Sequence, residues 1–145
     1  MRHIYMRGMV IVAALLMLAP GAAAQTEEKF KLRLTPVPLD GGMRATVTGS
    51  GSGSATLSGA KLAINGTFDG LKSPATIAKI HRGVATGVRG SAFLDLTVTK
   101  AMNGTFSGTF DLNPEQVDSL KKGKLYIQIH SEKAPEGNLW GWLLK

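Results

Sequence analysis

The sequence predicts an all-β domain, an antiparallel sandwich or barrel, with one short helix near residues 114–122. Two observations support this prediction. Apolar and polar residues alternate in several short segments, which is the two-residue period of a half-buried strand. Glycine, proline and asparagine residues separate these segments, and many short strands with regular turn signals are typical of antiparallel sandwiches and barrels.

The first 24 residues have the three parts of a secretory signal peptide. Arg2 and Arg7 carry positive charge, residues 9–18 are an unbroken apolar run, and residues 22–24 are three alanines before Gln25. The apolar run makes about 15 Å of helix, which is about half of the hydrocarbon thickness of a bilayer. We therefore expect cleavage before Gln25 rather than an uncleaved membrane anchor, and export to the periplasm or the medium.

The remaining residues, 25–145, suit a single domain. We expect a flexible polar leader at residues 25–29 and one β-domain at residues 30–145. A chain of this length buries roughly two-thirds of its unfolded surface, which is enough for a core without cross-links. No second apolar segment of membrane-spanning length follows the signal, so no integral membrane segment is expected after cleavage.

The chain contains no cysteine, which excludes disulfides, thiolate metal sites and a cysteine nucleophile. Secreted animal domains often carry disulfides, so their absence favours a bacterial protein. The formal charge of +7 falls by two, to +5, when Arg2 and Arg7 leave with the signal. No basic helix or aromatic-basic stripe accompanies this charge, so no nucleic-acid partner is expected. The scattered basic residues either form a solvated surface or attract anionic cell-surface polymers weakly.

The first predicted strand begins at Phe30, because Phe30, Leu32 and Leu34 alternate with polar residues; Pro36 then ends it. The next segment, residues 44–58, contains a Gly-Ser repeat, yet its even positions are polar and its odd positions apolar or small throughout. We predict one long strand there, whose glycines let a neighbouring strand approach closely. The alternative is a flexible linker.

The same alternation predicts further strands at residues 62–70, 75–81, 91–98, 105–112, 125–131 and 138–144. Asn103-Gly104 is a dipeptide that hairpin turns favour, and we predict another turn at residues 135–137. The helix near residues 114–122 has its own signals. Asn113 is a good N-cap, Pro114 fits the first helical position, Gln116 completes a capping box, and Gly123 ends the helix.

The second half of the chain resembles the chordin-type domain (CHRD) family. The resemblance rests on six segments in the family's order and spacing, at residues 78–83, 87–90, 108–112, 116–123, 126–131 and 134–143. It implies an extracellular or periplasmic β-sandwich of Greek-key type, immunoglobulin-like or superoxide-dismutase-like, over residues 30–145. It also implies a role in interaction, since the family has no established catalysis.

This chain departs from the family pattern at two places. The family often shows His-Ile-His where this chain has Lys79, Ile80 and His81. The family's closing segment usually reads Gly-Glu-Ile-Arg-Gly, whereas this chain has Asn138 and Trp140 at the acidic and the arginine positions. A histidine, an acid and an arginine are therefore replaced here.

His81 and His130 are candidate metal ligands, because two imidazoles on neighbouring strands can bind copper or zinc. Lys79 is expected to share a face with His81, since side chains repeat every two residues along a strand. Stable metal sites usually need three or four ligands. The alternative is that each histidine makes a structural hydrogen bond beneath a loop.

Trp140 and Trp142 are two residues apart, which places them on one face of the last strand. Exposed, they make an aromatic platform for a sugar or a protein; buried, they belong to the core. The hydroxyl-rich face at residues 46–58 is either a contact for a glycan or another chain, or a solvated sheet face. No Gly-x-Ser-x-Gly elbow is present, and a serine nucleophile would need one of two histidines as its base.

We therefore predict an exported, non-enzymatic β-domain that contacts a protein or a cell-surface glycan. No cofactor is expected, and no catalytic residue or metal ligand is assigned. The candidate binding residues are Lys79, His81, His130, Trp140 and Trp142. The alternative function is that of a weak copper- or zinc-binding, or vestigial redox, domain that uses His81 and His130.

Overall fold

The computed structural model describes residues 26–39 and 41–145; the predicted signal peptide, residues 1–24, lies outside them. The described chain has eight strands and one helix. They are β1 (Glu27–Pro36), β2 (Ser50–Ser58), β3 (Lys61–Asp69), β4 (Ala75–Arg82), β5 (Ser91–Val98), β6 (Gly104–Asp111), α1 (Pro114–Lys121), β7 (Leu125–Ser131) and β8 (Ala134–Trp142). No helix among these residues is long and apolar enough to span a membrane.

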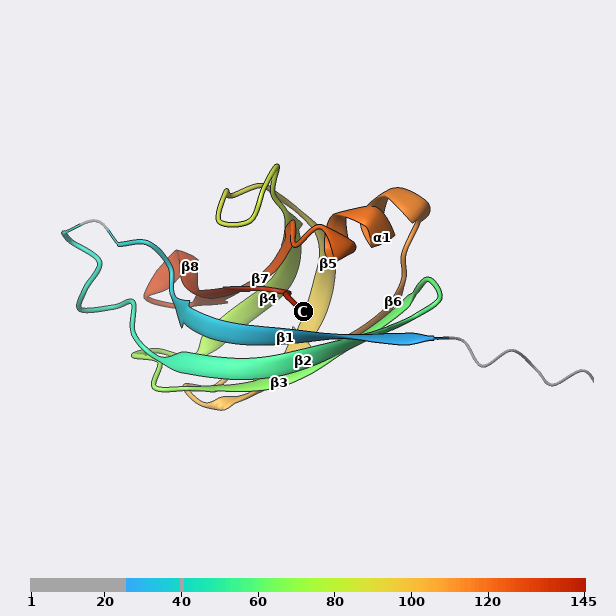
Figure 1. The fold of residues 1–145 in the computed structure, drawn as a ribbon. Helices are drawn as coiled ribbons and strands as arrows, with labels where there is room; N and C mark the ends of the chain where they lie inside the picture. Colours follow the sequence, from blue (N-terminus) through green and yellow to red (C-terminus); the bar gives the residue numbers. More distant parts are fainter. Residues whose placement is uncertain (1–25, 40) are drawn as a thin grey trace, which may run out of the picture.

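The strands form a closed antiparallel barrel in the order β1-β2-β3-β6-β5-β4-β7-β8, and β8 returns to β1 (Figure 1). The all-β prediction with one short helix is confirmed. The prediction of a Greek-key sandwich, immunoglobulin-like or superoxide-dismutase-like, is wrong, because the strands join into a ring whereas a sandwich is made of two separate sheets.

Two short seams close the ring. Each seam consists of two pairs of residues. Between β1 and β8, Thr35 pairs with Trp140 and Pro36 with Leu139. Between β5 and β6, Thr97 pairs with Ser107 and Val98 with Phe106. The other neighbouring strands pair over five to nine residues. Alternation within each strand predicts its buried face but not these few pairs, and the few pairs decide between a sandwich and a barrel.

The barrel interior is filled by the inward residues of the strands, among them Phe30, Ile64, Phe106 and Ile127. Gly66 of β3 leaves the space that the Phe106 ring occupies: a Cβ on Gly66 would stand 2.3 Å from the ring's Cζ atom. In the Gly-Ser repeat itself, a Cβ on Gly51 would stand 2.4 Å from the Thr67 carbonyl oxygen of β3, and a Cβ on Gly53 would stand 2.6 Å from the Asn65 carbonyl oxygen. The predicted role of these glycines in close strand approach is therefore confirmed, and the repeat from Ser50 onward belongs to strand β2 rather than to a linker.

Three predicted boundaries differ from the structure. β1 begins at Glu27 and so includes the last three residues of the predicted leader; the Glu28 carboxylate lies 3.6 Å from Lys121 Nζ. β2 begins at Ser50 rather than at residue 44, because the chain before it turns, with the Val47 amide bonded to the Met43 carbonyl. The hairpin between β7 and β8 turns at residues 132–133 rather than 135–137.

The helix α1 follows its sequence signals closely. The Asn113 side chain accepts a hydrogen bond from the Gln116 amide, and the Gln116 side chain accepts one from the Asn113 amide, so the capping box is confirmed. Gly123 follows the helix with a φ of 71°, a left-handed conformation that favours glycine. The helix lies at one end of the barrel (Figure 1) and packs Leu120 into the core.

Candidate functional site

All the candidate binding residues lie on the outward faces of three neighbouring strands. Lys79 of β4 pairs with Gln128 of β7, which pairs with Trp140 of β8. One step along, His81 pairs with Tyr126, which pairs with Trp142. Residues paired across an antiparallel sheet point to the same side. The prediction that Lys79 shares a face with His81 is therefore confirmed, and the two tryptophans join that face.

The His81 imidazole is partly buried under the loop that joins β4 to β5. Its ring stacks on Tyr126 with centroids 4.8 Å apart, and its Nδ1 lies 3.0 Å from the Gly90 carbonyl oxygen. A carbonyl only accepts, so Nδ1 carries the proton and Nε2 carries a lone pair. That Nε2 atom is buried and has no hydrogen-bond partner among the described residues. Burial lowers the pKa of His81 from its usual value of 6.5, against the hydrogen bond to Gly90, which raises it.

His130 is held separately from His81. The His130 Nδ1 atom lies 2.7 Å from the Pro135 carbonyl oxygen. The side-chain amide nitrogen of Gln128 lies 3.3 Å from the His130 Nε2 atom. His81 pairs with Tyr126, which precedes His130 by four residues on β7. The two histidines are therefore offset by about 13 Å along the strand direction. No group of three His, Cys, Asp or Glu side chains within the described part of the chain is arranged to hold a metal ion. Each histidine bonds to a backbone carbonyl: His81 does so beneath a loop, as the structural alternative expected, whereas the partner of His130 belongs to β8.

Tyr126 is the residue at this face that the sequence did not single out. It is 1% exposed, and its hydroxyl donates to the Gly90 carbonyl and accepts from the Gly90 amide, both at 3.0 Å. Its ring contacts Trp142, with centroids 4.5 Å apart, as well as His81. The alternation did place Tyr126 outward beside Gln128 and His130. A large aromatic residue at an outward position was the available signal for a covered face.

A second segment, made of residues 37–39 and 41–48, covers the other end of this face. Val37, Val47 and Ala134 form a small apolar cluster outside the barrel, and Trp140 packs against it. The buried Asn138 side chain anchors the segment, because it donates to the Thr48 carbonyl at 2.7 Å. Trp140 is thus half-buried, so it is neither the fully exposed platform residue nor the fully buried core residue that the sequence left open.

Lys79 is engaged in an ion pair. Its Nζ lies 3.2 Å from an Asp95 carboxylate oxygen on β5, at the edge of the covered area. Both side chains are well exposed, so this pair contributes little to stability. The structure therefore gives Lys79 a partner within the domain.

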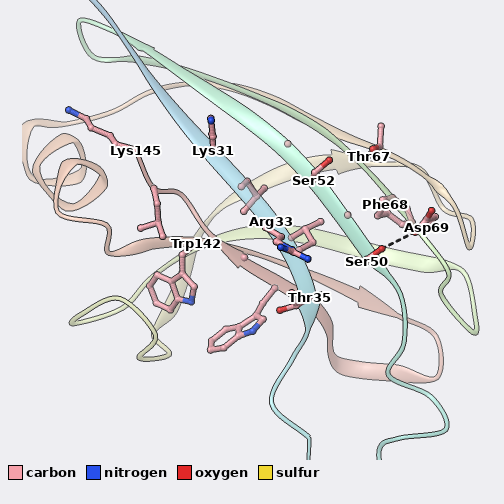
Figure 2. Close-up of a pocket in the computed structure, with 17 residues that line it drawn as sticks. Lys31, Arg33, Thr35, Ser50, Ser52, Thr67, Phe68, Asp69, Trp142 and Lys145 are labelled. Atoms are coloured by element: carbon pink, nitrogen blue, oxygen red, sulfur yellow. Dashed lines mark hydrogen bonds between the residues drawn. The ribbon is translucent and has the colours of Figure 1, made fainter.

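A groove of about 1090 Å³ lies beside this face, along β1, β2, β3 and β8. Trp140 and Trp142 both line it, with ring centroids 5.7 Å apart and planes at 71°. The two rings are therefore not one flat platform. Figure 2 shows Trp142 at one side of the groove. Gly141 between them lets β8 approach β1, since a Cβ there would stand 2.4 Å from the Arg33 carbonyl oxygen.

The rest of the groove is lined by four apolar residues, Leu32, Leu34, Phe68 and Leu144, and by polar side chains, of which more are positive than negative. Its hydroxyl and charged residues are Thr35, Ser50, Ser52, Thr67, Lys31, Arg33, Lys145 and Asp69. Asp69 accepts a hydrogen bond from Ser50 at 3.2 Å, shown dashed in Figure 2. Lys145 Nζ lies 3.4 Å from Glu28. The predicted hydroxyl-rich strand face thus forms part of the groove, while the contribution of β1 was not predicted, because it depends on the closure of β1 onto β8.

Of three comparisons with known proteins, one places the chain. A family model described as the CHRD domain matches residues 35–143. Comparisons with curated proteins and with solved structures found no match. The matched range includes β8, with both tryptophans, and most of the groove.

Proposed function

The chain belongs to the CHRD domain family, and on that premise we propose that it is an exported, non-enzymatic module that binds a cell-surface glycan in the groove, in the periplasm or outside the cell. The observation that carries the proposal is the groove itself. Half-buried Trp140 and Trp142 stand opposite exposed hydroxyls on β2 and β3. Aromatic faces pack against the apolar side of a sugar ring, and hydroxyls bond to its polar edge.

The groove favours binding over hydrolysis. Glycoside hydrolysis usually needs two carboxyl groups on either side of the scissile bond. Among the described residues that line the groove, Asp69 is the one side-chain carboxylate, and it is bonded to Ser50. The two histidines lie on the neighbouring face, where His81 bonds to Gly90 and His130 to Pro135, and neither lines the groove. We therefore expect bound glycans to be recovered intact.

The experiment that tests the proposal blocks the groove without touching the core. Ser52 lies in the groove and Ser107 outside it; both are exposed, outward strand residues. We expect Ser52→Tyr to abolish binding to cell-envelope glycans and the matched Ser107→Tyr variant to bind as the parent does, with both variants equally stable. Equal binding by the two variants, or a shortened glycan after incubation, would overturn the proposal.

A further inference from the structure

Three basic side chains follow one another on the outward positions of β1. Lys29, Lys31 and Arg33 are exposed, while Phe30 and Leu32 between them are buried in the core. Outward side chains repeat every two residues, so neighbouring charges stand about 6.6 Å apart along the strand. Lys31 and Arg33 line the groove, and Lys29 continues the row beyond it. The groove therefore has a regularly spaced row of positive charge along one side.

No ion pair formed among residues 26–39 and 41–145 includes any of these three side chains. The neighbours across the β1–β2 ladder are uncharged: Ser54 stands opposite Lys31, and Ser52 opposite Arg33. Hydroxyl groups do not neutralise an ammonium or a guanidinium group. The row consequently presents its charge to whatever occupies the groove.

The one acidic side chain of the groove offsets the row only in part. Asp69 pairs with Ser50 across the β2–β3 ladder, two residues beyond Ser52, and accepts a hydrogen bond from the Ser50 hydroxyl. Its single negative charge is outnumbered by the two positive charges of Lys31 and Arg33. Figure 2 shows Arg33 on β1 and Lys31 farther along the same strand. The positive side thus lies along β1, with the tryptophan side on β8 next to it.

We propose that the ligand of the groove is an anionic polysaccharide, whose carboxylate or phosphate groups are held by Lys31 and Arg33. This inference rests on the proposed glycan-binding function and specifies the charge of the glycan. A guanidinium binds a carboxylate or phosphate through two parallel hydrogen bonds, and an ammonium binds it as a point charge. A row of charges suits a polymer better than a single small anion, because several weak contacts to one chain reinforce each other.

The test compares charged and neutral forms of one polymer. Protein purified from cells that express the full chain is titrated with polygalacturonate, with its uncharged methyl ester, and with a glycerol-phosphate teichoic acid. We expect at least one anionic polymer to bind roughly tenfold or more tightly than the ester, and added salt to weaken that binding. The Lys31→Gln, Arg33→Gln double variant should lose roughly tenfold or more in affinity.

The control double variant is Lys61→Gln, Lys100→Gln, which removes the same charge from exposed positions outside the groove. It should bind as the parent does. If the ester binds and neither anionic polymer binds more tightly than it does, the anionic ligand is overturned but the glycan proposal stands. Binding to none of the polymers overturns both. Equally tight binding to duplex DNA, with the same dependence on Lys31 and Arg33, shows a general polyanion surface and overturns the polysaccharide as ligand.

Discussion

β1 and β7 belong to the same barrel and show opposite patterns of burial. In β1, buried apolar residues alternate with exposed polar ones from Lys29 to Thr35. In β7, every residue except the half-buried His130 is buried, including the outward Tyr126 and Gln128. The outward side of β1, β2 and β3 is an open face. The outward side of β4, β7 and β8 is a covered face, under the loop 83–90 and residues 37–39 and 41–48. An outward position on a strand is therefore not the same as an exposed one.

This difference separates the two functions considered for the chain. The histidines lie on the covered face, where His81 bonds to the Gly90 carbonyl of the loop 83–90 and His130 bonds to the Pro135 carbonyl of β8. The hydroxyls and the unpaired basic residues lie on the open face, where a large ligand has access. Trp140 and Trp142 stand at the border, packed against Tyr126 on one side and lining the groove on the other.

The largest expected effect is that of Tyr126→Ala on the covered face. The substitution removes a buried ring and both hydrogen bonds to Gly90, so we expect a loss of about 3–5 kcal/mol in the free energy of unfolding. Urea denaturation measures it. The counterpart on the open face, Ser54→Ala, should change the same quantity by less than about 0.5 kcal/mol. Similar losses at the two positions would mean that the two faces do not differ as described.

Gly66→Ala tests how tightly the interior behind the open face is packed. The new methyl group would stand 2.3 Å from Phe106 Cζ and 2.5 Å from the Ser52 carbonyl oxygen, so the strand or the ring must shift. We expect a loss of about 1–3 kcal/mol in the free energy of unfolding. Gly41→Ala is the control, because nothing lies within 4 Å of its added Cβ. An unchanged denaturation midpoint for Gly66→Ala would contradict this packing.

The smallest expected effect is a pH dependence of stability that comes from the covered face. The pKa of His81 is lowered from 6.5 in the folded protein by burial, so the unfolded chain takes up the proton first as pH falls. The stabilisation is complete above pH 6.5 and is lost as pH falls through the folded pKa. Urea denaturation between pH 8 and pH 5 should show this fall, and the His81→Phe variant should show a smaller one. If the free energy of unfolding of the variant falls with pH as steeply as that of the parent, His81 is not the source of the pH dependence.

The strands with regular alternation were predictable from the sequence. β5 matches its predicted range, residues 91–98, and β3 and β4 match theirs within one residue at each end. The capping residues around α1 were equally informative, because a cap is a local interaction between Asn113 and Gln116. In these segments each residue's environment is set by neighbours a few positions away.

The closure of the barrel and the groove were not predictable in the same way. Both depend on contacts between Thr35 and Trp140, which are distant in the sequence and share only a short ladder. The alternation in β1 shows that Lys31 and Arg33 point outward, but not that β8 lies beside them. Likewise, Tyr126 reads as an outward residue, and only the path of the loop through Gly90 shows that it is covered.

The brevity of the β1–β8 seam has a consequence for the coupling between binding and barrel opening. The seam consists of two residue pairs and one isolated bridge, between Lys31 and Leu144. Few hydrogen bonds must therefore break when the two strands separate locally. The groove spans the same seam, with Arg33 on one strand and Trp142 on the other. A ligand that touches both strands binds the closed barrel in preference to the opened one. Its binding free energy therefore opposes local opening, and the bound ligand stabilises the closed barrel.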